Sequence, residues 1–383
     1  MKRSVIWFTI LSLALVFFGN TKNMEISDRA LVHAVGIDQS DKGYTITMQV
    51  FKSDGAGSDT QIDPSKANTK IISATANSFN EAIELCENQL GNSIFLGHNQ
   101  VIVLGKNTDF SNTPDLMKYF IRHKDSFLGV NVVMAENTAK DILSVTVPTA
   151  TITTENFKDV INMYKQKGEI PQTDMVTFIN ETTKPDKSVL LPIVTTESEE
   201  AQNQSENKSD GNSGEQGSRE QTLNYKIEKN AVISNGKVVG EISVSDTTYI
   251  NLLTNESKEF LIPIKYKNEN MGIMLNKSHS KVVLEKENGN LIYKVNISVK
   301  ASLNDNQYSL EEREEMAKLI SDKIKNESER IFYQSLNEYN ADLFGINKLT
   351  KHYLPKVYLE YENNFEALKH SALISAKVCC KIQ

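Results

Sequence analysis

The sequence has few of the residues and runs on which several protein classes depend. Its 383 residues include three cysteines and one tryptophan, and three cysteines are too few for a disulfide framework. Their spacing suggests no metal site. The net charge is −7, with lysine and glutamate mixed along most of the chain, which argues against a nucleic-acid-binding protein. No run after Phe18 approaches the length of a membrane span.

The cysteines fit structural positions better than reactive ones. Cys86 lies in a helical pattern with Phe79 and Ile83, which predicts a small buried hydrophobe. Cys379 and Cys380 are adjacent in a predicted strand, so their side chains should point to opposite faces. Because a disulfide between such neighbours is strained, we expect none between them.

Catalytic signatures are missing as well. No Gly-x-Ser-x-Gly turn is present, and no cysteine shares a motif with a histidine. His98 is the strongest candidate for a general base, yet a histidine at the start of a strand, bonded to local backbone, is the simpler interpretation. His33 is predicted to be an ordinary, partly buried residue. Asp54, Asp59 and Asp63 lack the spacing of a calcium loop. The sequence therefore predicts no enzyme and no catalytic, cofactor-binding or metal-binding residue.

The amino-terminal segment has the pattern of an export signal. Lys2 and Arg3 precede an apolar run of about 15 residues that ends at Phe18, and a polar segment follows Gly19. The run falls short of the roughly 20 residues that span a bilayer comfortably. Since no Ala-x-Ala precedes the polar exit, we favour retention as a thin membrane anchor. The alternative is cleavage, after which only partner proteins would hold the chain.

A polar stretch divides the rest of the chain. Residues 197–222 are rich in Gln, Asn, Ser, Glu and Gly and have no aliphatic side chain larger than that of Ala201, which predicts a flexible linker. The amino-terminal domain could divide again near 135–150. The predicted organisation is a signal or anchor segment 1–19, an amino-terminal domain 25–196, the linker 197–222 and a carboxy-terminal domain 223–383.

Strands and helices interleave in the amino-terminal half. Tyr44–Phe51 alternates apolar and polar residues and predicts a strand, and Phe95–Leu104 predicts another. Ser78-x-x-Glu81 predicts the start of a helix, as does Thr113-Pro114. The predicted class is therefore α+β, with a mixed sheet and helices in this half and two to three domains in the whole chain.

The carboxy-terminal half predicts an antiparallel sheet with a long helix packed across it. Asn235-Gly236 lies between two alternating runs, which is a strong hairpin signal. A second hairpin is predicted around Asn288-Gly289, and a closing strand at Leu373–Ile382. Ser309-x-x-Glu312 is a capping box. The helix after it carries apolar residues near the helical period, namely Met316, Ile320, Ile324, Ile331 and Tyr339.

Five short motifs carry a resemblance to a known family. The chain reads Glu25-Ile26-Ser27-Asp28 and then Gly36-Ile37-Asp38, and later His98-Asn99-Gln100 before an apolar strand that ends at Gly105. Further on come the hairpin Ala231–Glu241 and Asp342-Leu343-Phe344-Gly345-Ile346. In this order the motifs resemble the Ger(x)C proteins, the C subunits of bacterial spore germinant receptors. Asn20 occupies the position of the family's lipidated cysteine, so no lipidation is expected.

The resemblance implies a non-enzymatic receptor subunit with an α+β fold. Its implied partners are a GerA-type A subunit and a transporter-like B subunit, and its implied place is the outer face of the inner spore membrane. The assembly would respond to a small nutrient germinant, and no cofactor or nucleic acid is implied. The alternative, from a different class, is an exported solute-binding module that captures a small molecule in a cleft between domains.

Overall fold

The structure of the chain is a computed structural model. The predicted segment 1–19, Asn20, the three loop aspartates and almost all of the predicted linker lie outside the residues that it describes. The described residues are 29–51, 68–111, 113–145, 152–184, 188–198, 223–257, 259–303, 308–361 and 364–382.

Nine strands of the described chain form a mixed first sheet, in the order β3-β2-β1-β5-β6-β7-β8-β9 with β4 paired to β1. The central pairs β1–β5, β5–β6 and β6–β7 are parallel, and the outer pairs are antiparallel. Its strands are β1 (Arg29–Ser40), β2 (Gly43–Phe51), β3 (Thr69–Ala76), β4 (Ser93–Phe95), β5 (Val101–Leu104), β6 (Asn131–Ala135), β7 (Ser188–Ser198), β8 (Leu223–Ser234) and β9 (Lys237–Ser243).

Helices cover both faces of this sheet. All four residues of β5 are buried, because Val101 and Val103 face one helical layer and Ile102 and Leu104 face the other. One layer contains α2 (Phe79–Leu90), α3 (Thr113–Arg122) and α6 (Met175–Thr183), and the other contains α4 (Ala139–Leu143) and α5 (Thr153–Gln166).

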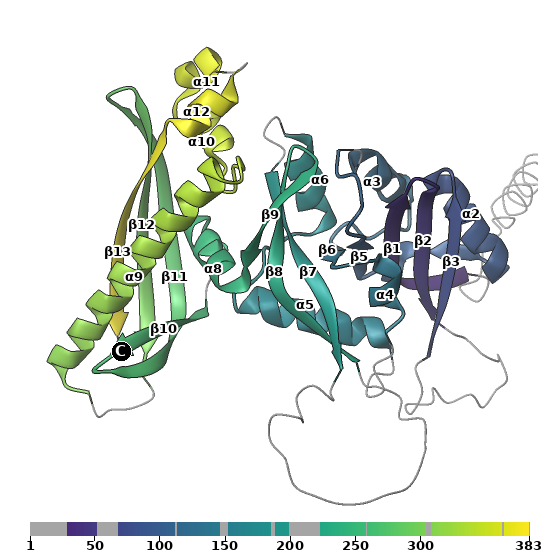
Figure 1. Cartoon of the computed structure of the whole chain (residues 1–383), viewed down its shortest axis with the longest axis horizontal. Coiled ribbons are helices and arrows are strands. Elements are labelled where there is room, and N and C mark those ends of the chain that lie inside the picture. Colours follow the sequence, from purple (N-terminus) through teal and green to yellow (C-terminus); the bar gives the residue numbers. More distant parts are fainter. Residues whose placement is uncertain are drawn as a thin grey trace, which may run out of the picture.

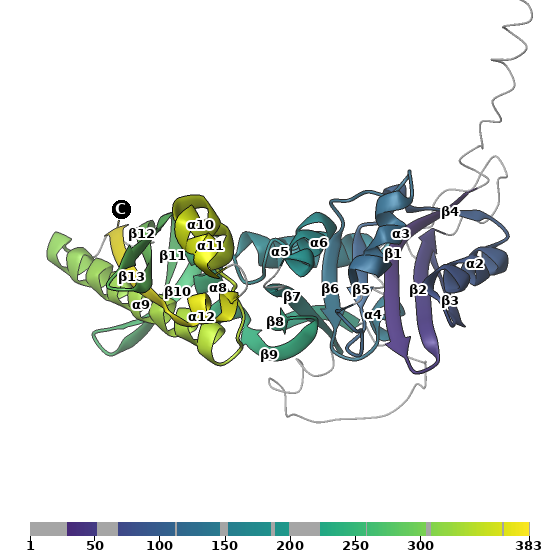
Figure 2. The ribbon, with the colours of Figure 1, turned by 90° about the horizontal axis from the view of Figure 1, so that it is seen from above.

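The second sheet has the order β10-β11-β12-β13 and lies at the other end of an elongated molecule (Figures 1 and 2). Its strands are β10 (Phe260–Tyr266), β11 (Glu269–Glu287), β12 (Asn290–Ser302) and β13 (Ala372–Ile382). The helices of this half are α8 (Val244–Leu253), α9 (Leu310–Asn337), α10 (Ile346–Tyr353), α11 (Pro355–Tyr361) and α12 (Phe365–His370).

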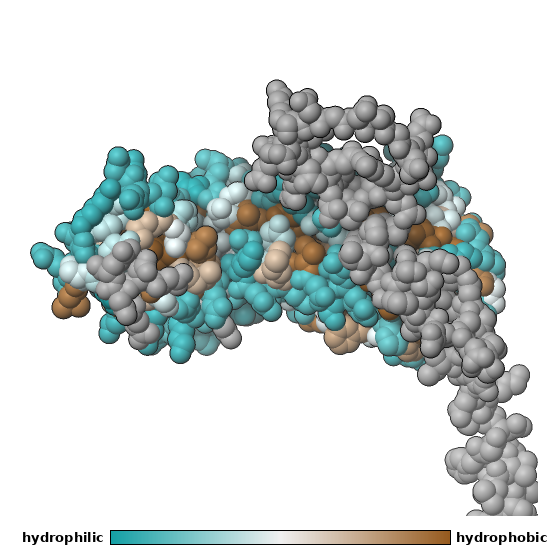
Figure 3. All heavy atoms as spheres, turned by 90° about the horizontal axis from the view of Figure 1, so that it is seen from below, coloured by the Kyte–Doolittle hydropathy of each residue, from teal (hydrophilic) through white to brown (hydrophobic). Residues whose placement is uncertain are grey.

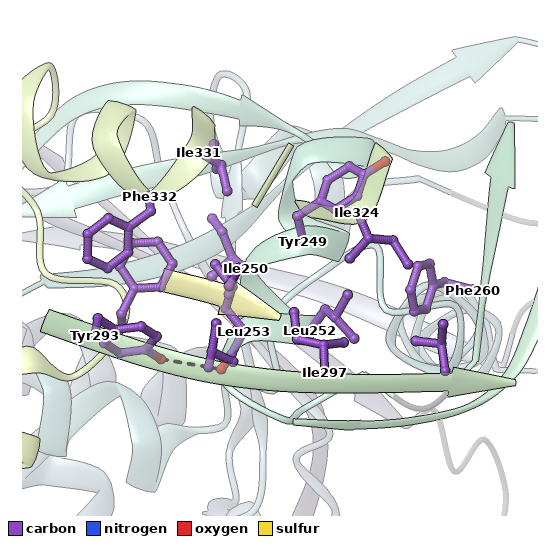
Figure 4. Packing of buried hydrophobic residues seen from close by; sticks show 14 of the residues in the cluster. Tyr249, Ile250, Leu252, Leu253, Phe260, Tyr293, Ile297, Ile324, Ile331 and Phe332 are labelled. Carbon is purple, nitrogen blue, oxygen red and sulfur yellow. Dashed lines mark hydrogen bonds between the residues drawn. The ribbon is translucent and has the colours of Figure 1, made fainter. Parts of the chain in front are cut away.

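The long helix α9 packs across the second sheet as predicted. Its capping box forms, since Ser309 Oγ accepts from Glu312 N at 3.2 Å and Glu312 Oε2 accepts from Ser309 N at 2.7 Å. Phe332 lies over the sheet beside Tyr293, and Ile324 lies further along the helix near Phe260, as Figure 4 shows. The same hydrophobic cluster includes residues of the first sheet, so the core continues through the junction of the two sheets.

The α+β class is confirmed, but three details differ from the predictions. The hairpin β8–β9 extends the first sheet, because β8 pairs with β7. β13 is parallel to β12, which the helical connection between them allows. The predicted strand Phe95–Leu104 is interrupted by a 3₁₀ turn, η2 (Leu96–His98), where pairing with β1 passes from β4 to β5.

Candidate functional site

A cleft of about 470 Å³ lies where the first sheet and its helices meet the second half of the chain. Residues of both halves line it. The first half contributes Thr173, Glu181 and Lys184, among others, and the second half contributes residues of α8 and of the segment before α10. A concave site built from two halves is a common place for a small ligand.

Buried asparagines hold α8 against the first half. Asn251, which is 2% exposed, donates from Nδ2 to the carbonyl oxygens of Gly168 at 2.8 Å and Ile170 at 2.9 Å. Asn230 Nδ2 donates to Glu169 O at 3.1 Å and to Thr247 Oγ1 at 2.8 Å. These bonds satisfy the carbonyls of the turn after α5, which would otherwise be costly to bury. One wall of the cleft is therefore fixed by side-chain bonds to backbone.

Asp342 forms another wall by capping α10. Its Oδ1 accepts from Phe344 N at 3.2 Å and Ile346 N at 2.9 Å, and its Oδ2 accepts from Asn347 N at 3.0 Å. Asp342 N donates to Ser188 Oγ of β7 at 3.1 Å, which ties the cap to the first sheet. Because backbone N–H groups at the start of α10 hydrogen-bond both oxygens of this carboxylate, Asp342 has a structural role.

The remaining charges of the cleft are of both signs. Lys184 and Glu181 pair with each other at 2.5 Å. Glu256 and Lys348 also line the cleft, and neither is in an ion pair within 4 Å among the described residues. The Glu256 carboxylate accepts a hydrogen bond from the backbone of Gln172, and burial raises its pKa while this bond and the charge of Lys165 oppose the shift. The arrangement therefore offers one carboxylate and one ammonium to a small polar ligand. A cleft between domains was the predicted alternative, but no motif marked these residues, because they come from segments that lie far apart in the chain.

The motif Gly36-Ile37-Asp38 also has a structural role. The Asp38 carboxylate accepts from Ala139 N at 2.7 Å and Lys140 N at 3.1 Å, so it caps α4. A Cβ at Gly36 would lie 3.0 Å from both the Ala139 Cβ and a methyl of Leu143. Burial raises the pKa of Asp38, although the two backbone bonds oppose this shift. Asp38 and Asp342 thus each cap the start of a helix, one in each half of the chain.

The structure brings the two candidate histidines together. His98 is exposed in η2, and its ring stacks on that of His33 at 6.0 Å between centroids. His33 is 6% exposed, and its Nδ1 has no hydrogen-bond partner in the described part of the chain. Burial, with a smaller contribution from His98, lowers the pKa of His33 to about 4. His33 is therefore neutral near pH 7.

The cysteines are free in the structure. Cys86 is buried, and burial raises the pKa of its thiol to about 11, which makes it unreactive. Cys379 is exposed and Cys380 packs against the core, so the two point to opposite faces as predicted. Among the described residues, no three His, Cys, Asp or Glu side chains gather in a way that could hold a metal ion.

Several large apolar side chains are exposed on the described surface. Leu310 of α9 is 76% exposed, Leu359 of α11 69%, and Phe127, in the segment between α3 and β6, 58%. On the face seen from below, hydrophobic atoms are scattered among hydrophilic ones (Figure 3). None of the described helices has the length and apolar content to cross a bilayer.

Comparisons with known proteins agree along the chain. The family model described as "Spore germination protein N-terminal domain" matches residues 22–196, and the model "Spore germination B3/ GerAC like, C-terminal" matches residues 228–383. A putative spore germination protein of Bacillus subtilis, YfkR, is 19% identical over 321 residues, which are 82% of this chain and 78% of the relative. The crystal structure of the GerBC protein has a TM-score of 0.54 at 16% identity, covers 91% of this chain and 96% of its own, and shows the likeness of fold.

Proposed function

The chain belongs to the Ger(x)C family of spore germination proteins, and from this premise we propose that it is the non-enzymatic C subunit of a spore germinant receptor. The observation that carries the proposal is the match of both family models, in order, over most of the chain. The GerBC-like fold, which covers both halves, supports it. On this proposal the chain has no catalytic, cofactor-binding or metal-binding residue and takes part in the response to nutrient germinants.

The proposed partners are a GerA-type A subunit and a transporter-like B subunit. The proposed location is the outer face of the inner spore membrane. Because Asn20 stands where a lipidated cysteine is expected, attachment would come from the apolar segment 1–19 or from the partners. Mass spectrometry of the amino terminus from spores separates these two routes. A terminus at residue 1 supports the anchor, and a terminus between Gly19 and Glu25 supports attachment by partners.

We keep the predicted division into domains 25–196 and 223–383 as a proposal, with one addition from the fold. β8 and β9 lie beyond the predicted boundary but pair with the first sheet. Cleavage within residues 199–222 should therefore leave the two fragments associated. Separation of the fragments on a sizing column after such cleavage would contradict this.

Deletion of the gene followed by a germination assay tests the proposed function. Spores without this chain should germinate more slowly in at least one nutrient, and a copy of the gene in trans should restore the rate. Strains that lack paralogous C subunits as well remove the masking effect of a second receptor. An unchanged germination rate in every nutrient, in such a multiply deleted strain, would contradict the proposal.

A solute-binding module remains the second candidate, because the cleft presents Glu256 and Lys348 to a small polar ligand. A ligand that binds the folded protein raises its unfolding temperature by mass action. The chain from Glu25 onward should therefore be screened against amino acids and sugars by thermal shift. A saturable increase that Lys348→Ala abolishes would favour this candidate, and no increase with any compound would favour the receptor subunit.

A further inference from the structure

The described chain covers the second sheet on one face only. β10 alternates buried and exposed residues along its whole length, and β12 does nearly the same. The buried residues face α8 and α9, as Tyr293 and Ile297 do in Figure 4. The exposed residues occupy the opposite face, which we call the outer face.

Lysines stand opposite one another on the outer face. Lys277 of β11 lies opposite Lys300 of β12, and Lys300 lies opposite Lys381 of β13. Two further rows follow, each with one residue from β11, β12 and β13, namely His279, Ser298 and Cys379, and then Lys281, Asn296 and Lys377. All residues of the three rows are exposed. We call the five lysines of these rows the lysine rows.

The lysine rows have no acidic partner. None of the five has a carboxylate within ion-pair distance in the part of the chain that the structure describes, and no acidic residue stands in the three rows. Lys294 on the same face is different, because it pairs with Glu285 and Glu287, each at 2.6 Å. Neighbouring strands lie about 5 Å apart, and like charges directly opposite each other are destabilising. A bound anion would remove this repulsion.

A groove of about 700 Å³ lies over the first two rows. Lys277, Lys300 and Lys381 line it. Its polar lining also includes His279, Asn276, Asn255, Ser278 and Ser298, together with one carboxylate, that of Glu259. The groove therefore places three ammonium groups and several uncharged polar groups around one space, with a single opposing charge.

We propose that this groove binds a phosphate-bearing anion through Lys277, Lys300 and Lys381, the three lysines of the first row. Lysine ammonium groups bind phosphate as compact point charges. The first row spans two strand spacings, about 10 Å, which suits a ligand with several anionic groups or an anionic headgroup. A free polyphosphate and an acidic lipid headgroup share this chemistry. The proposal is independent of the receptor function, since it rests only on the register and exposure of the second sheet.

Calorimetric titration of the full-length protein in a nonionic detergent tests the site. One arm uses inorganic tripolyphosphate. The other uses short-chain phosphatidylglycerol below its micelle concentration, with short-chain phosphatidylcholine as the comparison. Binding of tripolyphosphate supports a soluble ligand, and binding of phosphatidylglycerol alone supports a headgroup. Binding of neither probe overturns the proposal.

A pair of matched triple variants shows whether the lysine rows are responsible. The variant Lys277→Gln, Lys300→Gln and Lys381→Gln should bind at least tenfold more weakly. The control variant Lys226→Gln, Lys229→Gln and Lys267→Gln removes the same charge from lysines that are in ion pairs elsewhere, and it should bind within twofold of the wild type. An equal loss in both variants would mean a general attraction to charge and would overturn the site.

The free protein gives an independent test. Lys300→Glu places a carboxylate between Lys277 and Lys381, so the midpoint of thermal unfolding without ligand should rise. Tripolyphosphate should raise the midpoint of the wild type but not that of this variant. A lower midpoint for Lys300→Glu without ligand would show that the lysines do not repel one another, and the proposal would fail.

Discussion

Removal of the Asp342 carboxylate should destabilise the second half of the chain strongly. In Asp342→Ala three N–H groups, those of Phe344, Ile346 and Asn347, lose their acceptor, and the site is buried because Asp342 is only 4% exposed. Hydrogen bonds to a charged group contribute about 1.5–3 kcal/mol each, and loss of a helix cap costs about 0.5–2 kcal/mol. Since these contributions overlap, we expect the free energy of unfolding to fall by about 3–4 kcal/mol.

The assay is urea unfolding followed by circular dichroism, with hydrogen exchange to locate the effect. The amides of Phe344, Ile346 and Asn347 should exchange faster in Asp342→Ala. Asp342→Asn keeps one acceptor oxygen and should lose about half as much stability, whereas Asp322→Ala, at an exposed position of α9, should lose little. A loss for Asp342→Ala below about 0.5 kcal/mol, or unchanged exchange at the three amides, would refute the cap.

Three further predictions concern other contacts. The pKa of His33 falls from 6.5 to about 4 on folding, so the unfolded chain binds the proton more tightly and stability drops as the pH falls through this window. Between pH 7 and pH 4, His33→Leu should therefore lose about 3 kcal/mol less stability than the wild type in urea unfolding, and an equal loss in both proteins would contradict the burial of a neutral His33. Gly240→Ala would place a Cβ 2.4 Å from the Tyr339 ring and should cost about 1–3 kcal/mol in urea unfolding. An unchanged midpoint would contradict this close packing. Asn251→Leu leaves the Gly168 and Ile170 carbonyls without a donor and should cost about 2–4 kcal/mol, and a wild-type melting temperature would contradict the described bonds.

Local signals in the sequence predicted local structure well. The capping box at Ser309 forms, and the Asn235-Gly236 turn joins β8 to β9, because each depends on residues within one or two turns of chain. Such local signals do not predict which strand the β8–β9 hairpin pairs with. A strand pattern gives the buried face but not the neighbouring strand, so the pairing of β8 with β7 across the predicted linker could not be inferred.

The same limit explains why the candidate sites went unpredicted. Lysines are visible at exposed positions of each strand, and the net charge of −7 hides them in the composition. Only the register of β11, β12 and β13, with its unexpected parallel pair, places the lysines side by side. The cleft likewise needs the contacts of α8 and α10 with the first half. Asp38 and Asp342 were recognised as motif residues, but their work as caps appeared only in the hydrogen bonds.

The most direct test of the central claim is affinity purification of the tagged, full-length protein from detergent-solubilised spore membranes, followed by mass spectrometry. If the chain is the C subunit of a germinant receptor, a GerA-type A subunit and a transporter-like B subunit should be recovered with it, in similar amounts and from the membrane fraction. Recovery of the chain alone, or from the soluble fraction without a polytopic partner, would contradict the account.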